Sequence, residues 1–384
     1  MTRLVLLGGG HAHLFVLEAL ARRRFPPAEV ALVSEVRWQA YSGMVPGLIG
    51  GRYRSEDVSF DLASIARCAG ARFVEARAAR IRPDRRLVEV VGADPLEYDI
   101  LSIATGSSVQ GSELATLRER VLLAKPIERA REIVPALTRI ARENGAAEIA
   151  VVGGGAAGVE IALAVAGRLR ALQAARARVT LLEAAPRLLP ERSARAGRAA
   201  ARALARQGVS ARCGEEVTGA APGSLLLAGG AWRADVVVLA AGAASTELLR
   251  TSRLAQDGRG FLLVDDALRS VSDARIFAAG DAATPARYPE TPKAGVYAVR
   301  AGPVLRDNLA AACAGRRPPR RYTPRRRFLA ILNTGDGRAI ATYGGLAAEG
   351  RWVMALKDAI DRRFMRRFQR LAGCRAPDAP IIRW

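Results

Sequence analysis

The sequence predicts an α/β fold made of two similar units and a small C-terminal region, and two observations carry this prediction. The chain has 384 residues, which is too long for one ordinary core, and its 50% apolar and 25% charged content is typical of globular proteins. A short apolar run, a glycine turn and a helical stretch rich in Ala and Leu occur twice, about 145 residues apart. This composition excludes a disordered or collagen-like chain.

The first unit starts with the apolar run 4–7 and continues through a glycine turn and a helix to a second apolar run at 30–33. In such turns the first glycine permits the bend, the second lets a pyrophosphate approach, and the third allows close helix packing. His13 stands at the third position, so we expect it to push the helix and strand apart or to tilt the helix. Either Ser34 or Glu35 must serve an adenosine ribose.

The second unit carries the complete pattern, with Gly153, Gly155 and Gly158 after the apolar run 148–152. Glu183 directly follows the next apolar run and is placed to accept ribose hydroxyls. Its carboxylate would repel a 2′-phosphate, which favours NADH over NADPH. The sequence therefore predicts two Rossmann-like dinucleotide-binding domains.

Three further apolar runs, at 98–104, 234–241 and 275–279, end in glycine turns of the kind that closes a buried strand. Ligands bind outside the carboxyl ends of such strands. We expect one dinucleotide-binding domain from 1–112 and 245–315, a second from 113–244, and a C-terminal region from 316–384.

Charge and composition limit the kinds of partner that we expect the protein to bind. The chain has 59 Lys and Arg against 37 Asp and Glu, a formal charge of +22, and only three lysines, Lys125, Lys293 and Lys357. A genomic coding bias explains much of this arginine content, although a basic surface attracts polyanions. No helix-turn-helix, zinc-finger, KH or RRM pattern is present, so we expect no nucleic-acid partner.

The cysteine and hydropathy patterns exclude further classes of protein. Cys68, Cys213, Cys313 and Cys374 lie far apart without CxxC spacing, which indicates a reducing cytoplasm and no metal site. No apolar run reaches 18 residues, and the N-terminus shows no signal-peptide cleavage site. The protein is expected to be cytoplasmic or peripheral on the inner face of the cytoplasmic membrane.

The paired glycine motifs, the Ala104-Thr105-Gly106 strand end and the Gly280-Asp281 element together resemble the FAD-dependent pyridine nucleotide-disulfide oxidoreductase superfamily. The resemblance covers essentially the whole chain. The disulfide reductases of that superfamily carry a CxxxxC pair where residues 39–47 have no cysteine. More narrowly, the sequence resembles type II NADH dehydrogenases, and most of all the oxidoreductase module fused to selenide, water dikinase in some bacteria. The strings that carry this resemblance are GGGHAHL, YSGMVPGLIGG, PKAGVYAVRAGPVLRDNL and LKDAIDRRFMRRF.

The resemblance implies that the domain of residues 1–112 and 245–315 binds FAD and that the domain of residues 113–244 binds NAD. It also implies cofactor roles for particular residues. It assigns NADH to Gly153, Gly155, Gly158 and Glu183. It assigns FAD to Gly8, Gly10, His11, Ala12, His13, Ser34, Glu35, Ser42, Pro46, Ala78, Thr105, Gly106, Gly280, Asp281, Lys293 and Ala294.

Two residues are the candidates for a catalytic role. Thr291 and Pro292 form a helix start signal before Lys293, whose ammonium would suit the negative charge of a reduced flavin. Glu160 lies on the first turn of the NADH-binding helix and, in related dehydrogenases, beside the nicotinamide. Each has a plainer interpretation, a solvated surface lysine and a carboxylate that complements the helix dipole.

The C-terminal tail combines a basic linker with an amphipathic helix. Residues 316–327 (RRPPRRYTPRRR) read as an extended linker, and 328–345 as a pair of strands. Apolar residues then recur every four positions from Trp352 to Phe368 among basic ones. Such a helix either lies in an anionic membrane interface or packs on the flavin domain or on the partner of a homodimer.

Three functions remain open at this point. The first is an NADH dehydrogenase that passes electrons from FAD to a quinone or similar small acceptor without a redox disulfide. The second is an NADH-dependent reductase of a ferredoxin or rubredoxin, and the third is a non-enzymatic flavin redox sensor.

Overall fold

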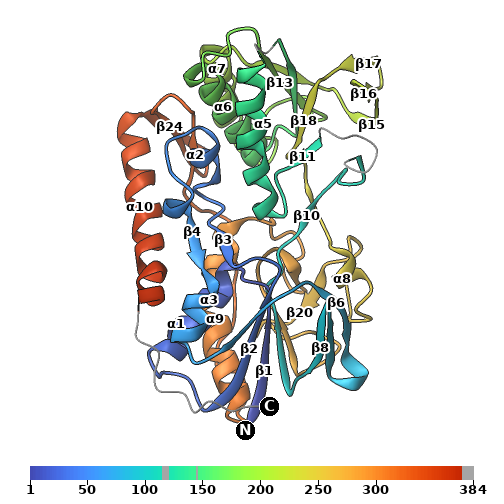
Figure 1. The fold of residues 1–384 in the computed structure, drawn as a ribbon, viewed down its shortest axis with the longest axis vertical. Coiled ribbons are helices and arrows are strands. Elements are labelled where there is room, and N and C mark those ends of the chain that lie inside the picture. The colour runs from blue at the N-terminus through green and yellow to red at the C-terminus, as the bar shows by residue number, and fades with distance from the viewer. Residues whose placement is uncertain (115–120, 144–145, 374–384) are drawn as a thin grey trace.

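The computed structural model describes residues 1–114, 121–143 and 146–373 (Figure 1). Its two largest sheets each have five parallel strands in the doubly wound order that the repeated units predict. The mixed α/β fold with two Rossmann-like units is therefore confirmed. Across the described ranges, no helix is both long and apolar enough to span a bilayer.

The first sheet holds the N-terminal glycine turn at the end of its central strand. Its strand order is β21 (Ile276–Ala278), β9 (Ile100–Ile103), β1 (Thr2–Leu7), β2 (Ala28–Ser34) and β5 (Arg72–Glu75), with every pair parallel. The helices of this half are α1 (His11–Ala21), α3 (Leu62–Cys68) and α9 (Gly295–Cys313), and α1 packs on α9. Residues from both ends of the sequence thus build one sheet.

The second sheet repeats this arrangement with the central glycine turn. Its order is β11 (Val121–Leu123), β18 (Val236–Leu239), β12 (Glu148–Val152), β13 (Arg178–Glu183) and β14 (Ser210–Cys213), again all parallel. Helices α5 (Ile133–Arg142), α6 (Ala156–Ala171) and α7 (Ala194–Arg206) belong to this half, which lies at the top of Figure 1. The domain boundaries that we expect from the sequence remain a prediction.

Smaller elements connect and cover the two sheets. They are β3 (Trp38–Ala40) with β4 (Ser59–Asp61), β6 (Ala78–Arg82) with β7 (Leu87–Val90) and β8 (Ala93–Glu97), β10 (Ser108–Val109) with β19 (Ala243–Ala244), β15 (Val217–Ala221) with β16 (Ser224–Leu227) and β17 (Gly230–Arg233), and β20 (Leu262–Val264) with β22 (Ala283–Pro285). The short helices are α2 (Val45–Ile49), α8 (Glu247–Arg250) and the 3₁₀ turns η1 (Glu56–Val58), η2 (Pro83–Arg85), η3 (Ile127–Glu132), η4 (Gly280–Ala282) and η5 (Arg370–Gly373).

The C-terminal region differs from the prediction in two details. Three antiparallel strands form instead of two, namely β23 (Ala330–Asn333), β24 (Ala339–Tyr343) and β25 (Leu346–Gly350), and helix α10 (Arg351–Gln369) follows them. The segment 316–327 has no helix or strand, as expected, but it is held against α9. Tyr322 is buried with its hydroxyl donating to the Tyr297 carbonyl (3.2 Å), and Asn308 accepts from the Arg320 backbone (2.9 Å).

Helix α10 packs on the flavin half of the molecule. Figure 1 shows it running along one side, and its inner face buries Val353, Met354, Met365 and Phe368. The Phe368 ring contacts Phe15 edge-on at 5.1 Å. The interpretation that the helix docks on the flavin domain therefore describes this face of α10.

One helix boundary was predicted wrongly. We expected a helix to start at Thr291, but α9 begins at Gly295 with Ala294 as its N-cap. The Thr291 hydroxyl donates to the Tyr288 carbonyl (2.7 Å) and so closes a turn instead of capping a helix. The helix is continuous through Pro303.

Candidate functional site

Each glycine turn has a position at which a side chain would not fit. A Cβ at Gly10 would lie 2.3 Å from the Ala104 carbonyl oxygen. At the third position of the second turn, a Cβ on Gly158 would lie 1.7 Å from the Gly153 oxygen. The backbones therefore approach as closely as a pyrophosphate-binding turn requires, and the N-termini of α1 and α6 are left facing the same cavity.

His13 occupies the third position of the first turn, where the second turn has Gly158. Its ring is fully buried, with Nδ1 2.7 Å from the Gly8 oxygen and Nε2 2.9 Å from Ser102 Oγ. Because a carbonyl only accepts, the proton lies on Nδ1 and Ser102 donates to Nε2. Burial lowers the pKa of His13 to about 4, so the ring is neutral. The side chain ties the turn to β9 and points into the core, away from the cavity.

A cavity of about 1760 Å³ opens between the two sheets. Of the residues assigned to the cofactors and to catalysis, all except His13 and Gly158 line it. Those two lie behind the turns and shape them. The fold thus brings together residues of the two repeated units that are more than 100 positions apart in the sequence.

The flavin side of the cavity offers unused polar atoms. His11 Nε2 and Thr105 Oγ1 are buried without a hydrogen-bond partner among the described residues. Burial lowers the pKa of His11 to about 4. Buried polar atoms without partners cost stability, and the oxygens and hydroxyls of FAD would supply the missing bonds. Together with the turn at Gly10, these residues fit the cofactor.

Ser34 and Glu35 lie at the carboxyl end of β2, where the ribose was expected. The Ser34 hydroxyl already donates to the Val36 carbonyl (2.9 Å), whereas Glu35 is exposed and lines the cavity. Glu35 is therefore the better placed of the two for ribose hydroxyls. Ser42, Pro46 and Ala78 complete the expected flavin side of the wall.

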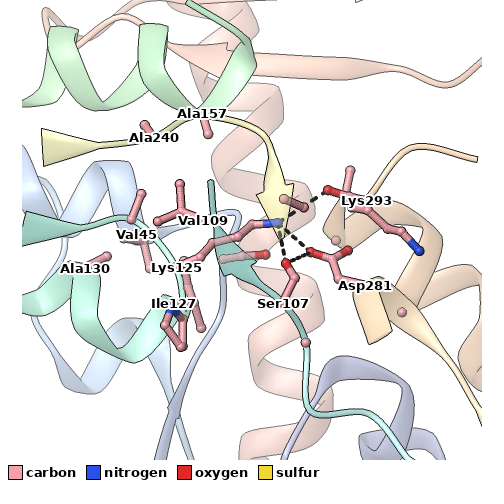
Figure 2. Close-up of a pocket in the computed structure, with 18 of the residues that line it drawn as sticks. Val45, Ser107, Val109, Lys125, Ile127, Ala130, Ala157, Ala240, Asp281 and Lys293 are labelled. Atoms are coloured by element: carbon pink, nitrogen blue, oxygen red, sulfur yellow. Dashed lines mark hydrogen bonds and ion pairs between the residues drawn. The ribbon is translucent and has the colours of Figure 1, made fainter. Parts of the chain in front are cut away.

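Lys293 lines the cavity, but its ammonium is engaged elsewhere. Nζ donates to the Ala283 carbonyl (2.5 Å) and to Thr284 Oγ1 (2.8 Å), and it lies 4.0 Å from the centre of the Phe261 ring. Burial lowers its pKa to about 8. Asp281 is instead met by Lys125, at 2.5 Å (Figure 2). Lys125 is one of the three lysines of this arginine-rich sequence, as Lys293 is, but the sequence analysis gave it no role.

Glu160 lies at the junction of the two halves, beside a buried group of charges. Its Oε1 accepts from the Asn333 backbone N–H (2.7 Å). Burial raises the pKa of Glu160 to about 7, against the attraction of Lys357. Lys357 donates to the Gly43 carbonyl (2.8 Å) and to Asp361 (3.0 Å). Both Lys357 and Asp361 come from α10, within the string LKDAIDRRFMRRF, but the sequence analysis assigned neither of them a role in the site.

Glu183 lies beside the second glycine turn, and its role at the ribose remains a prediction. One carboxylate oxygen accepts from Gly154 N–H, and the other accepts from Ala185 N–H (2.7 Å). Glu191, which the sequence had not singled out, accepts from Ala156 N–H (3.3 Å) at the start of α6. The N–H of Ala156 that Glu191 takes up would face the pyrophosphate of NADH, so Glu191 would have to move aside for the nucleotide to bind there.

Comparison with known proteins assigns the chain to a family. The model of the pyridine nucleotide-disulphide oxidoreductases matches residues 2–302, so the protein belongs to this family. It is an FAD flavoprotein oxidoreductase with NADH as co-substrate. The narrower likeness to the module fused to selenide, water dikinase remains a prediction.

Particular relatives refine this picture. The chain is 32% identical to an NADH dehydrogenase-like protein of Mycobacterium tuberculosis over 294 residues, which cover 74% of this chain and 73% of that protein. It is 30% identical over 211 residues to a rubredoxin-NAD(+) reductase of Pseudomonas putida, covering 52% and 50%. The structure of the sulfide:quinone oxidoreductase from Aquifex aeolicus superposes with a TM-score of 0.78 at 19% identity, covering 97% of this chain and 92% of that one. That of NDH2 from Plasmodium falciparum, in complex with NADH, superposes with a TM-score of 0.74 at 13% identity, covering 98% and 99%.

Proposed function

We propose that the protein oxidises NADH and passes the electrons from FAD directly to a quinone or a similar small acceptor. One observation carries this proposal. The glycine turns and Glu160 share one cavity, and no cysteine is among the described residues that line it. Electrons therefore have no dithiol to pass through on this route. The NADH dehydrogenase-like relative supports the same reading.

The residues of the cavity wall have distinct roles in this proposal. Gly8, Gly10 and Thr105 line the cavity and would hold FAD, while Gly153 and Glu183 line it and would hold NADH. Bound FAD supplies the hydride chemistry, accepting electrons from the nicotinamide and releasing them to the acceptor. The protein's own task is to place the two cofactors, to exclude water and to handle protons.

Glu160 is the residue that we assign to the proton. Reducing a quinone with NADH takes one hydride and one proton. With a pKa of about 7, Glu160 is about half protonated at neutral pH, so it can give up a proton and take one up again at little cost. After release, the buried ammonium of Lys357 stabilises the carboxylate, and that attraction opposes the effect of burial. The ammonium of Lys293 already donates hydrogen bonds to oxygens of β22, so we do not assign this role to it. We infer instead that Lys293 shapes the cavity wall.

The acceptor would enter beside α10. The rings of Tyr41 and Phe364 stack at 4.7 Å in the cavity wall, and Ile360 lines the same wall while 46% exposed. Leu356 and Trp352 continue this apolar stripe along the outer surface of the helix. A flat apolar molecule such as a quinone suits that route. The stripe and its neighbouring arginines would rest on an anionic membrane at the cytoplasmic face.

The test is steady-state NADH oxidation with two kinds of acceptor. A soluble quinone analogue should support turnover, and an acidic ferredoxin or rubredoxin should not exceed it. Faster turnover with the protein carrier would instead favour the carrier reductase, which the Pseudomonas relative suggests. Flavin that NADH reduces but that no acceptor reoxidises would favour the redox sensor.

A further inference from the structure

All three lysines of this arginine-rich chain lie in the wall of one cavity. Lys125, Lys293 and Lys357 are the only lysines in the sequence, and each lines the cofactor cavity. Arginine serves at the other basic positions. An ammonium differs from a guanidinium in being compact, with three donors around one atom. The retention of lysine at these places indicates that the geometry requires it.

Lys125 uses each of its three donors. Its Nζ lies 2.5 Å from Asp281 Oδ2, 3.2 Å from Ser107 Oγ and 3.5 Å from the Lys293 carbonyl oxygen. Ser107 is buried and donates to the same Asp281 oxygen (3.1 Å). Figure 2 shows Lys125 pointing into this group while the Lys293 side chain points the other way. The three acceptors therefore converge on one ammonium.

The group joins elements that belong to different sheets. Lys125 follows β11 of the second sheet after one residue. Asp281 lies in η4, just beyond β21 of the first sheet, and Ser107 follows β9 of that sheet. The two side chains of the ion pair keep only 27% and 15% of their exposure. The contact is thus sheltered from water and more sensitive to a lost partner than a surface ion pair is.

We propose that Lys125 is a positioning residue of the flavin site, which holds Asp281 in place for FAD and fixes the second sheet against the first. Asp281 is the residue that the family resemblance assigns to FAD. Without Lys125, its carboxylate would face the cavity uncompensated and would oppose the negative charge of a reduced flavin. The proposal rests on FAD and is independent of which acceptor the enzyme uses.

An arginine cannot replace this lysine. The guanidinium is planar and longer, and its donors point away from one another in a fork. It cannot direct three hydrogen bonds from one atom toward Asp281, Ser107 and the carbonyl of residue 293. Substitution by arginine keeps the charge but should lose the geometry, and this separates positioning from simple charge.

The test compares Lys125→Met and Lys125→Arg with the wild-type holoenzyme. The readouts are the FAD dissociation constant, from the recovery of FAD fluorescence on dilution, and the reduction potential of the bound flavin. We expect Lys125→Met to weaken FAD binding by about tenfold or more and to make the potential more negative. Lys125→Arg should also weaken FAD binding. The surface variant Arg139→Gln, which also removes one positive charge, should change neither quantity.

A second variant guards against an effect on folding alone. In the double variant Lys125→Met with Asp281→Asn, no charge is left unpaired, so its potential should return toward the wild-type value. A general packing defect would not reverse in this way. The proposal is overturned if Lys125→Met keeps both FAD affinity and potential, or if Lys125→Arg equals the wild type. A wild-type protein that holds no FAD overturns the flavin assignment as well, whereas failure with quinones leaves this inference intact.

Discussion

Replacing Glu160 by glutamine should stabilise the protein at alkaline pH. In the folded protein burial raises the pKa of Glu160 to about 7, from an ordinary value of 4.5. The unfolded chain therefore ionises this residue at a pH where the folded protein still keeps it protonated. Glutamine has nearly the same shape and never ionises, and its amide oxygen can accept from the Asn333 N–H as the carboxylate does.

The direction and size of the effect follow from these two values. Between pH 4.5 and about 7 the folded state binds more protons than the unfolded state, so the free energy of unfolding falls as the pH rises. Each pH unit in that window corresponds to about 1.4 kcal/mol. Glu160→Gln should thus match the wild type near pH 4.5 and exceed it by up to about 3 kcal/mol at pH 8.

Urea denaturation at a series of pH values, followed by far-ultraviolet circular dichroism with FAD at fixed concentration, measures this difference. Glu143→Gln is a matched control, because Glu143 is exposed at the end of α5 and its replacement should give no pH-dependent gain. An advantage of Glu160→Gln that is equal at every pH, or absent at pH 8, would show that Glu160 ionises in its ordinary range. The proton that we assign to quinone reduction could then not reside on this residue.

Three further outcomes are expected. Glu183→Ala should narrow the preference of flavin reduction for NADH over NADPH in stopped-flow bleaching, and an unchanged ratio would remove Glu183 from the ribose site. His13→Ala should lower the melting temperature through two lost hydrogen bonds, about 2 kcal/mol together, and this difference should shrink as the pH falls from 6.5 toward 4, where only the folded wild-type ring stays neutral. Changing the exposed Trp352, Leu356 and Ile360 to serine should reduce co-sedimentation with anionic vesicles while FAD is retained, and undiminished sedimentation would exclude the helix as the contact.

The fold was predictable from the sequence because its signals are local. A strand, a glycine turn and a helix within about 30 residues suffice to identify each nucleotide-binding unit. Two local details differ from the predicted fold. The hydroxyl of Thr291 closes a turn with Tyr288 instead of capping α9, and the glycine turn at 335–337 is followed by two strands and not by one.

The site was predictable only where one segment supplies it. The turns at Gly8 and Gly153 carry their own pattern, so the cavity wall near them followed from the sequence. Lys125 has no such pattern, because its partner Asp281 lies 156 positions away. Lys357 has one local partner, Asp361 in its own helix, but its contact with Gly43 joins residues 314 positions apart, which only folding brings together. The rarity of lysine was the one signal that could have marked both.

The geometry of α10 shows why packing on the protein core and contact with a membrane are not alternatives for this helix. Its apolar residues recur every four positions, but an α-helix turns by about 100° per residue, so each step of four advances about 40° around the axis. From Trp352 to Phe368 the stripe therefore rotates by about 160°. The exposed fractions follow this rotation, from 62% at Trp352 and 46% at Ile360 to 0% at Phe368. One end of the stripe faces outward and the other packs against Phe15, with Phe364 between them in the cavity wall. A helix of this pattern can anchor in the core and still present an apolar surface, which places the proposed membrane contact next to the entrance that a quinone would use.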